Sequence, residues 1–139
     1  MKFLLDANLP AAFARALDAL ARNDGDTVMH VSDLVDAAAD DRVWIAALAD
    51  QPGSGVAISG DKRMLTRKHE LFALRQHRIT IFILAPACSA FRSWEKAALL
   101  VGHWPRITAA AKSSDAGSIF VVPPGRNASL KRGGAAPPP

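Results

Sequence analysis

Short apolar runs recur along the chain, separated by polar stretches with helical periodicity. They predict strands at Lys2–Leu5, Thr27–Val31, Val56–Ser59, Ile79–Leu84 and Ile119–Val122. These runs are mostly apolar throughout rather than alternating, which is typical of a parallel sheet buried on both faces. We therefore expect a sheet at the centre of the molecule, covered on two sides.

The segments between the strands predict helices, because their apolar residues recur at three- and four-residue spacing. The predicted helices span residues 9–22, about 41–50, 67–77 and 89–103. Alternation of strand and helix indicates an α/β fold, a three-layer α/β/α sandwich with a mainly parallel sheet, over residues 1–122. Residues 123–139 are rich in Pro and Gly and carry basic residues, which predicts a flexible C-terminal tail or a partner-binding arm outside the core.

The helical periodicity also assigns inward faces. In the second helix we expect Val43, Ala47 and Leu48 to face the core, and in the fourth helix Trp94, Ala98 and Val101. Trp44 also stands at helical core spacing and is expected to be a packing residue. Pro105 is expected to follow the end of the fourth helix, because proline interrupts helical hydrogen bonding.

Composition narrows the class of protein. Half of the 139 residues are hydrophobic, enough for a buried core. A single cysteine, Cys88, excludes an internal disulfide framework and a cysteine-cluster zinc site, and we expect it to be a buried thiol. The apolar runs are too short to cross a bilayer or to form a signal-peptide core, so we expect a cytoplasmic protein that does not enter a membrane.

Charge is distributed unevenly along the sequence. Residues 1–61 hold ten acidic residues against four Lys and Arg, whereas residues 62–139 hold three against thirteen. A solvated acidic surface with a basic tail accounts for this pattern. An acidic centre beside a basic surface, as an enzyme acting on nucleic acid needs, accounts for it equally.

Three aspartates stand where an α/β fold places its chemistry, beyond the carboxyl ends of the strands. Asp6 follows the first strand, Asp61 follows the strand ending at Ser59, and Asp41 lies at the start of a helix. Converging carboxylates repel one another unless a cation joins them, and hard oxygen ligands suit Mg²⁺ or Mn²⁺. Each aspartate taken alone is better explained as a turn or cap residue, and it is the joint placement of Asp6 and Asp61 at strand ends that favours a site. Asp40 and Asp36 compete with Asp41 for its role.

Basic residues follow the third aspartate closely. Lys62, Arg63 and Arg67 are candidates to bind nucleic-acid phosphates at the mouth of an acidic site, and the family resemblance described below makes them RNA phosphates. The alternative for such residues is a solvated surface. Glycine motifs that cradle nucleotide phosphates are absent from the sequence, and no pair of histidines has zinc spacing.

Several short motifs together resemble a known family. They are Asp6-Ala7-Asn8-Leu9-Pro10, His30-Val31 before an acidic loop, Asp41-Arg42-Val43-Trp44-Ile45 and Ser59-Gly60-Asp61-Lys62-Arg63. In this order they resemble the compact branch of the PIN-like domains, which includes the VapC-type toxins of VapBC toxin–antitoxin pairs. The resemblance covers about residues 2–85 and extends more weakly to about residue 122.

The resemblance implies a metal-dependent endoribonuclease that cleaves RNA with Mg²⁺ or Mn²⁺. It assigns Asp6, Asp41 and Asp61 as catalytic metal ligands, with Asn8 and Ser59 orienting the carboxylates or metal-bound water. Many PIN nucleases carry a further acid after the next strand, where this chain reads Ala85-Pro86-Ala87-Cys88-Ser89. Whether one or two ions bind therefore stays open.

The resemblance also implies partners, namely a cognate antitoxin protein and a second copy of the chain in a homodimer. Two other functions remain open at this point. One is a catalytically inactive PIN-like binding module, which the missing fourth acid favours. The other is a receiver-like phosphoacceptor domain, which also has aspartates at strand ends but usually has an acidic pair after its first strand, where this chain has Ala7.

Overall fold

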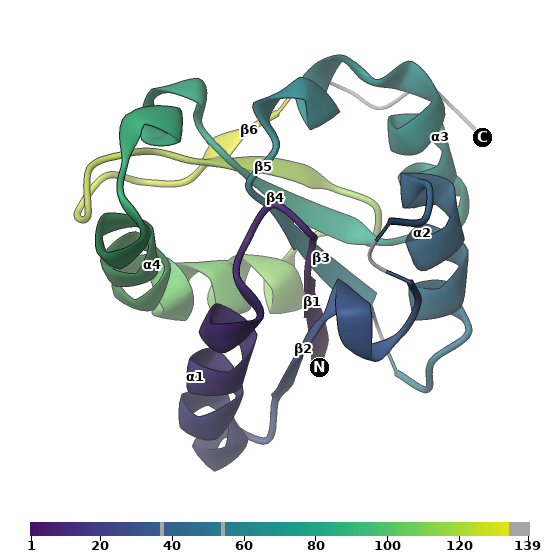
Figure 1. The fold of residues 1–139 in the computed structure, drawn as a ribbon, viewed down its shortest axis with the longest axis horizontal. Coiled ribbons are helices and arrows are strands. Elements are labelled where there is room, and N and C mark those ends of the chain that lie inside the picture. The colour runs from purple at the N-terminus through teal and green to yellow at the C-terminus, as the bar shows by residue number, and fades with distance from the viewer. Residues whose placement is uncertain (37, 54, 134–139) are drawn as a thin grey trace.

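The computed structural model describes residues 1–36, 38–53 and 55–133, which form one sheet with helices on both faces (Figure 1). The strands are β1 (Lys2–Leu5), β2 (Thr27–His30), β3 (Gly55–Ser59), β4 (Thr80–Leu84), β5 (Ile119–Val122) and β6 (Lys131–Arg132). Their order across the sheet is β2-β1-β3-β4-β5-β6. Strands β1 to β5 run parallel, and β6 pairs antiparallel with β5.

The helices lie in two layers, one on each face of the sheet. They are α1 (Ala11–Ala21), α2 (Asp41–Ala49), α3 (Lys68–Gln76) and α4 (Ser93–Ser113), with short 3₁₀ turns η1 (Arg22–Asp24), η2 (Val31–Asp33), η3 (Lys62–Thr66) and η4 (Pro86–Ala90). Helices α1 and α4 cover one face, and α2 and α3 cover the other (Figure 1). The predicted α/β/α sandwich with a mainly parallel sheet is confirmed.

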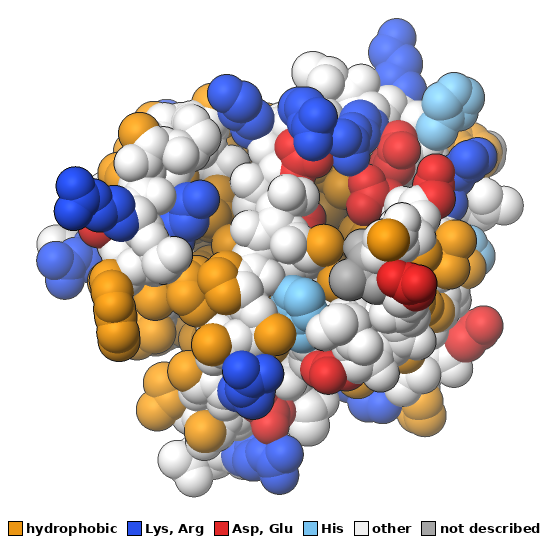
Figure 2. All heavy atoms as spheres, in the orientation of Figure 1, with side chains coloured by type: hydrophobic (Ala, Val, Ile, Leu, Met, Phe, Trp, Pro, Cys, Tyr) orange, Lys and Arg blue, Asp and Glu red, His pale blue; other side chains and the backbone are white. Residues whose placement is uncertain are grey.

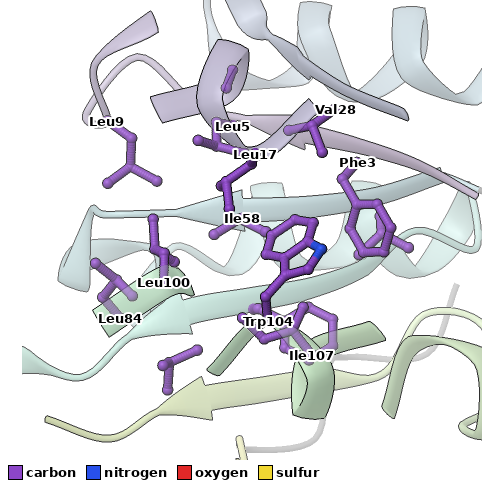
Figure 3. Close-up of a cluster of buried hydrophobic side chains, with 14 of the residues drawn as sticks. Phe3, Leu5, Leu9, Leu17, Val28, Ile58, Leu84, Leu100, Trp104 and Ile107 are labelled. Atoms are coloured by element: carbon purple, nitrogen blue, oxygen red, sulfur yellow. The ribbon is translucent and has the colours of Figure 1, made fainter. Parts of the chain in front are cut away.

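Alternate strand residues supply two separate cores, because successive side chains of a strand point to opposite faces. Phe3 and Leu5 pack with α1 and α4, while Leu4 between them packs with α2 and α3, and all three are fully buried. In the first core the rings of Phe3 and Trp104 lie 4.9 Å apart between centroids (Figure 3). Burial on both faces explains why the strands are mostly apolar rather than alternating.

The inward faces of two helices differ from the prediction. In α2, Trp44 and Leu48 are buried as predicted, but Val43 is 48% exposed and Ile45 is buried instead. The helix begins at Asp41, and its buried residues are Trp44, Ile45 and Leu48.

Helix α4 also differs in its face and its length. Trp94 and Val101, predicted to be inward, are 89% and 47% exposed. The buried face instead includes Leu100 and Trp104. Because the helix has about 3.6 residues per turn, Trp94 then lies on the side away from the sheet. The helix continues through Pro105 to Ser113, because Pro105 lies on the exposed side, where water can satisfy the carbonyl group that proline leaves without a partner.

The segment after residue 122 is attached to the sheet as far as the structure describes it. Pro123 is buried, and Lys131 and Arg132 extend the sheet beside β5. Gly133 donates a backbone hydrogen bond to the Ile119 carbonyl at 2.8 Å, where a side chain would overlap Ile119. The predicted flexible tail therefore differs from the structure over residues 123–133, since backbone pairing with an open sheet edge needs no apolar pattern. Residues 134–139 lie outside the described residues.

Candidate active site at the carboxyl edge of the sheet

The parallel register of two neighbouring strands brings the first and third predicted aspartates to one edge. Leu5 of β1 is paired with Ile58 of β3, and the Asp6 N–H donates to the Ile58 carbonyl at 3.0 Å. Asp61 follows two residues after the last residue of β3. Both carboxylates therefore leave the sheet at its carboxyl edge, as predicted for parallel strands.

Asp6 is a buried carboxylate held by three hydrogen bonds. Only 3% of the residue's surface is exposed to solvent. Oδ1 accepts from the backbone N–H groups of Asn8 at 3.1 Å and Gly60 at 3.3 Å, and Oδ2 accepts from the Ser59 hydroxyl. Burial raises the pKa of Asp6 above its ordinary value, and the hydrogen bonds from Ser59, Gly60 and Asn8 offset this only in part.

Asp61 lies at the start of η3 and is surrounded by donors. Its Oδ1 accepts from the Arg63 backbone N–H at 3.0 Å and from Arg63 Nε at 3.1 Å. Its Oδ2 lies 3.3 Å from Arg63 Nη2 and 3.2 Å from Arg67 Nη1. Burial raises the pKa of Asp61, but the Arg63 hydrogen bonds and the charges of Arg67 and Arg63 outweigh it, so the pKa lies below its ordinary value.

Ser59 joins the environments of the two strand-end aspartates. Its hydroxyl donates to Asp6 Oδ2 and accepts from the Asp61 backbone N–H at 3.0 Å. A fully buried serine at the last position of β3 therefore orients one carboxylate and the backbone of the other. Asn8 contributes through its backbone N–H, which donates to Asp6.

Asp41, the first residue of α2, reaches the same region from a different layer. Its Oδ1 accepts from the Trp44 indole N–H at 2.8 Å, and its Oδ2 accepts from Arg67 Nη1 at 2.8 Å. Asp40 instead caps α2 by accepting from the Arg42 backbone N–H at 2.9 Å. Asp36, the other competitor, is exposed and accepts from the backbone N–H of residue 38 at 2.9 Å.

Arg67 brings the second and third aspartates together. One guanidinium nitrogen, Nη1, lies 2.8 Å from Asp41 Oδ2 and 3.2 Å from Asp61 Oδ2. The sequence predicted Arg67 as a phosphate-binding residue and carried no signal of this bridge. Asp41 and Arg67 are 26 positions apart, and they meet only because α2 and α3 pack side by side on the same face of the sheet.

The other two predicted phosphate-binding residues lie on the surface. Lys62 is exposed, and the Arg63 side chain is 69% exposed although it contacts Asp61. Figure 2 shows Lys and Arg side chains interspersed with acidic side chains over η3 and the start of α2. The region around Asp6, Asp41 and Asp61, which we call the acidic edge, is thus bordered by cationic groups.

The donor set fits a divalent cation at Asp41 and Asp61, because two carboxylates already share one cationic group there and carboxylate oxygens suit Mg²⁺ and Mn²⁺. Over the described ranges, however, no three His, Cys, Asp or Glu residues lie close enough together to hold a metal ion. Asp6 is turned toward Ser59, and Arg67 lies between the other two carboxylates. A metal ion would therefore have to replace the guanidinium as the shared cation.

Two further residues have structural roles, and one of them, Cys88, is the buried thiol that the sequence predicts. His30 is buried, with Nε2 2.8 Å from the Leu9 carbonyl and Nδ1 2.7 Å from the Ser32 hydroxyl. Cys88 is 1% exposed, and burial raises the pKa of its thiol. Neither residue contributes to the acidic edge in this structure.

Comparison with known proteins gives one match. The model of the family described as "PIN like domain" matches residues 1–86, a stretch that includes all three aspartates and Arg67. No curated protein and no solved structure matches the chain significantly. Among the described residues, none of the helices has the length and hydropathy to cross a membrane.

Proposed function

Because the chain belongs to the PIN-like domain family, whose fold is typically that of a nuclease, we propose that it is a metal-dependent endoribonuclease. The observation that carries the proposal is the convergence of Asp41 and Asp61 on a single cation at the carboxyl edge, beside the buried Asp6. In this proposal Asp6, Asp41 and Asp61 are the catalytic acids, and the cofactor is Mg²⁺ or Mn²⁺.

The residues of the site have complementary tasks. Asp41 and Asp61 hold the cation. The Ser59 hydroxyl fixes the positions of the Asp6 carboxylate and the Asp61 backbone through its two hydrogen bonds. When bound, the ion supplies Lewis acidity toward the scissile phosphate and makes a water molecule a better nucleophile. The exposed Lys62 next to Asp61 contacts RNA phosphates and offsets the repulsion between the acids and the RNA.

We further propose, from the resemblance to VapC-type proteins, that the chain is the toxin of a toxin–antitoxin pair. A cognate antitoxin, a homodimeric assembly and action in the cytoplasm belong to this proposal. The support is the ordered set of motifs from Asp6 to Arg63. The toxin role is supported if expression of the wild type arrests growth and expression of Asp61→Asn does not. It is contradicted if cells grow normally with both chains although extracts of the cells that express the wild type cleave RNA.

An inactive PIN-like binding module is the competing function. Each carboxylate oxygen of Asp41 and Asp61 already has a protein partner, which favours a site whose charge is balanced without a metal. An inactive module of this kind binds RNA without cleaving it, and its binding does not depend on Mn²⁺.

The test is RNA cleavage by the purified chain in Mn²⁺ and in EDTA, on a pool of structured RNAs that includes tRNA. Asp61→Asn is expected to abolish cleavage. Asp50→Asn is the matched control, since it removes an exposed carboxylate at the far end of α2 and should leave cleavage unchanged. Cleavage that persists in EDTA or in Asp61→Asn contradicts the proposal, and binding without cleavage in every condition favours the inactive module.

A further inference from the structure

Arg67 occupies an unusual position in the acidic edge. It lies between η3 and α3, and its side chain crosses to the start of α2. The side chain is 31% exposed, so one end of it is open to solvent while Nη1 contacts Asp41 and Asp61. The guanidinium therefore joins two elements that are separate in the sequence.

The neighbouring Arg63 makes a different kind of contact. Its side chain is 69% exposed, and within the described part of the chain its ion pair is with Asp61. Asp61 is buried, and Arg63 contacts both of its carboxylate oxygens from the solvent side without reaching α2. Arg67 is thus the residue whose position depends on both carboxylates.

A guanidinium and a divalent ion cannot occupy this place together. The ion requires the carboxylate oxygens at about 2.0–2.1 Å for Mg²⁺, and Arg67 Nη1 contacts one Oδ2 oxygen of each aspartate. Two cations on one pair of oxygens would repel each other strongly at such short range. Without either cation, the two carboxylates would repel each other instead.

We propose that Arg67 is an internal counter-ion that competes with the catalytic metal for Asp41 and Asp61. In the metal-free protein its single positive charge is shared by the two carboxylates and links α2 to η3, while Arg63 supplies a second positive charge at Asp61. When a divalent ion binds, the guanidinium leaves toward the solvent that already reaches the side chain. The inference rests on the proposed metal-dependent function, and it adds a positioning residue whose removal strengthens metal binding.

The test measures Mn²⁺ binding to the purified full chain by isothermal titration calorimetry at constant ionic strength. Arg67→Gln is expected to bind Mn²⁺ roughly tenfold more tightly than the wild type, a change in binding free energy of about 1.4 kcal/mol. Arg42→Gln is the matched control, because Arg42 is an exposed cation on the same helix as Asp41 but pairs with Asp40. Its affinity should stay within about twofold of the wild type, since exposed pairs contribute little.

A second measurement covers the stability of the variants. In EDTA, Arg67→Gln should melt below the wild type, and added Mn²⁺ should raise its melting temperature more than that of the wild type. Arg67→Lys keeps the charge on a smaller donor group and should bind Mn²⁺ with intermediate affinity. If Arg67→Gln does not fold, the Lys variant decides between the outcomes.

The outcomes separate this inference from the proposed function. If wild type and Arg67→Gln bind Mn²⁺ equally, or the variant binds more weakly, Arg67 does not compete with the metal, while the proposed nuclease stands on its own cleavage test. Binding by Arg67→Gln that Asp61→Asn abolishes supports the inference. If no variant binds Mn²⁺, both the inference and the metal-dependent function are rejected.

Discussion

Replacing Asp6 with asparagine should make the metal-free protein more stable while abolishing the proposed activity. Asp6 is 3% exposed, and among the described residues its carboxylate accepts hydrogen bonds from neutral donors and forms no ion pair. An asparagine side chain has nearly the same shape. Its carbonyl oxygen can accept from Asn8 and Gly60, and its amide can donate to the Ser59 hydroxyl.

The magnitude follows from what the substitution removes. Each hydrogen bond to a charged acceptor is worth about 1.5–3 kcal/mol against about 0.5–1.5 kcal/mol for a neutral one, so Asp6→Asn weakens three bonds. Removing a buried charge recovers a desolvation cost of several kcal/mol. Burial is the larger effect on the pKa of Asp6 and raises it, so the net gain should be on the order of 1 kcal/mol, or roughly 4 °C in Tm.

The pH dependence has a definite sign. Because the pKa of Asp6 in the folded state lies above its ordinary value of 3.8, the ionised group destabilises the fold at neutral pH. That penalty disappears as the pH falls through the raised folded pKa and is absent below the unfolded value. The difference between Asp6→Asn and the wild type should therefore be largest near pH 7 and should shrink toward pH 4.

The assay is thermal and urea denaturation followed by circular dichroism, in EDTA, at several pH values. Asp6→Ala is the control, since it leaves buried donors without a partner and should cost about 1–3 kcal/mol. Asp61→Asn should change stability at neutral pH in the opposite direction to Asp6→Asn, that is, it should lower it. Burial raises the pKa of Asp61, but Arg63 and Arg67 lower it overall, so its stabilising contribution is present above pH 3.8 and is lost as the pH falls through the lower folded value. An Asp6→Asn variant that is no more stable than the wild type at neutral pH would refute this account.

The remaining predictions concern packing and reactivity. In urea denaturation, Trp104→Ala should lower the free energy of unfolding by about 3–5 kcal/mol because the ring is buried against the sheet. Trp94→Ala should change it by less than about 0.5 kcal/mol, since Trp94 is 89% exposed. Equal effects of the two substitutions would contradict the assigned face of α4. Trp44→Phe keeps the aromatic ring but removes the donor to Asp41, and calorimetry should show altered Mn²⁺ affinity with a loss of stability of about 1 kcal/mol. Cys88 should react with a thiol reagent only after denaturation, because it is 1% exposed and its pKa is raised; rapid reaction of the native protein would show that this part of the core opens.

Local pattern was sufficient for the strands and for two of the site residues. The apolar runs predicted β1, β3 and β4 to within a residue or two, because a strand buried on both faces must be apolar throughout. The positions of Asp6 and Asp61 followed from the strands they terminate. The family match over residues 1–86 confirms the PIN-like part of the resemblance, while the VapC-type branch stays a prediction.

Helix faces were less predictable. A rotation of α4 exposes Trp94 and buries Leu100, and either phase satisfies a three- and four-residue spacing over a short stretch. Pro105 ends a helix by local rules, yet here the packing of Trp104 and Ile107 on the sheet outweighs one missing hydrogen bond.

The sequence by itself determined which residue types are available at the sheet edge: three aspartates, a serine and a set of cations. Only the tertiary structure decided how they are paired. Arg67 became a bridge between Asp41 and Asp61, and Asp6 became a buried carboxylate turned toward Ser59. The physical reason is that strand and helix formation depend on neighbours along the chain, whereas charge pairing depends on distances across packed layers that no local pattern encodes.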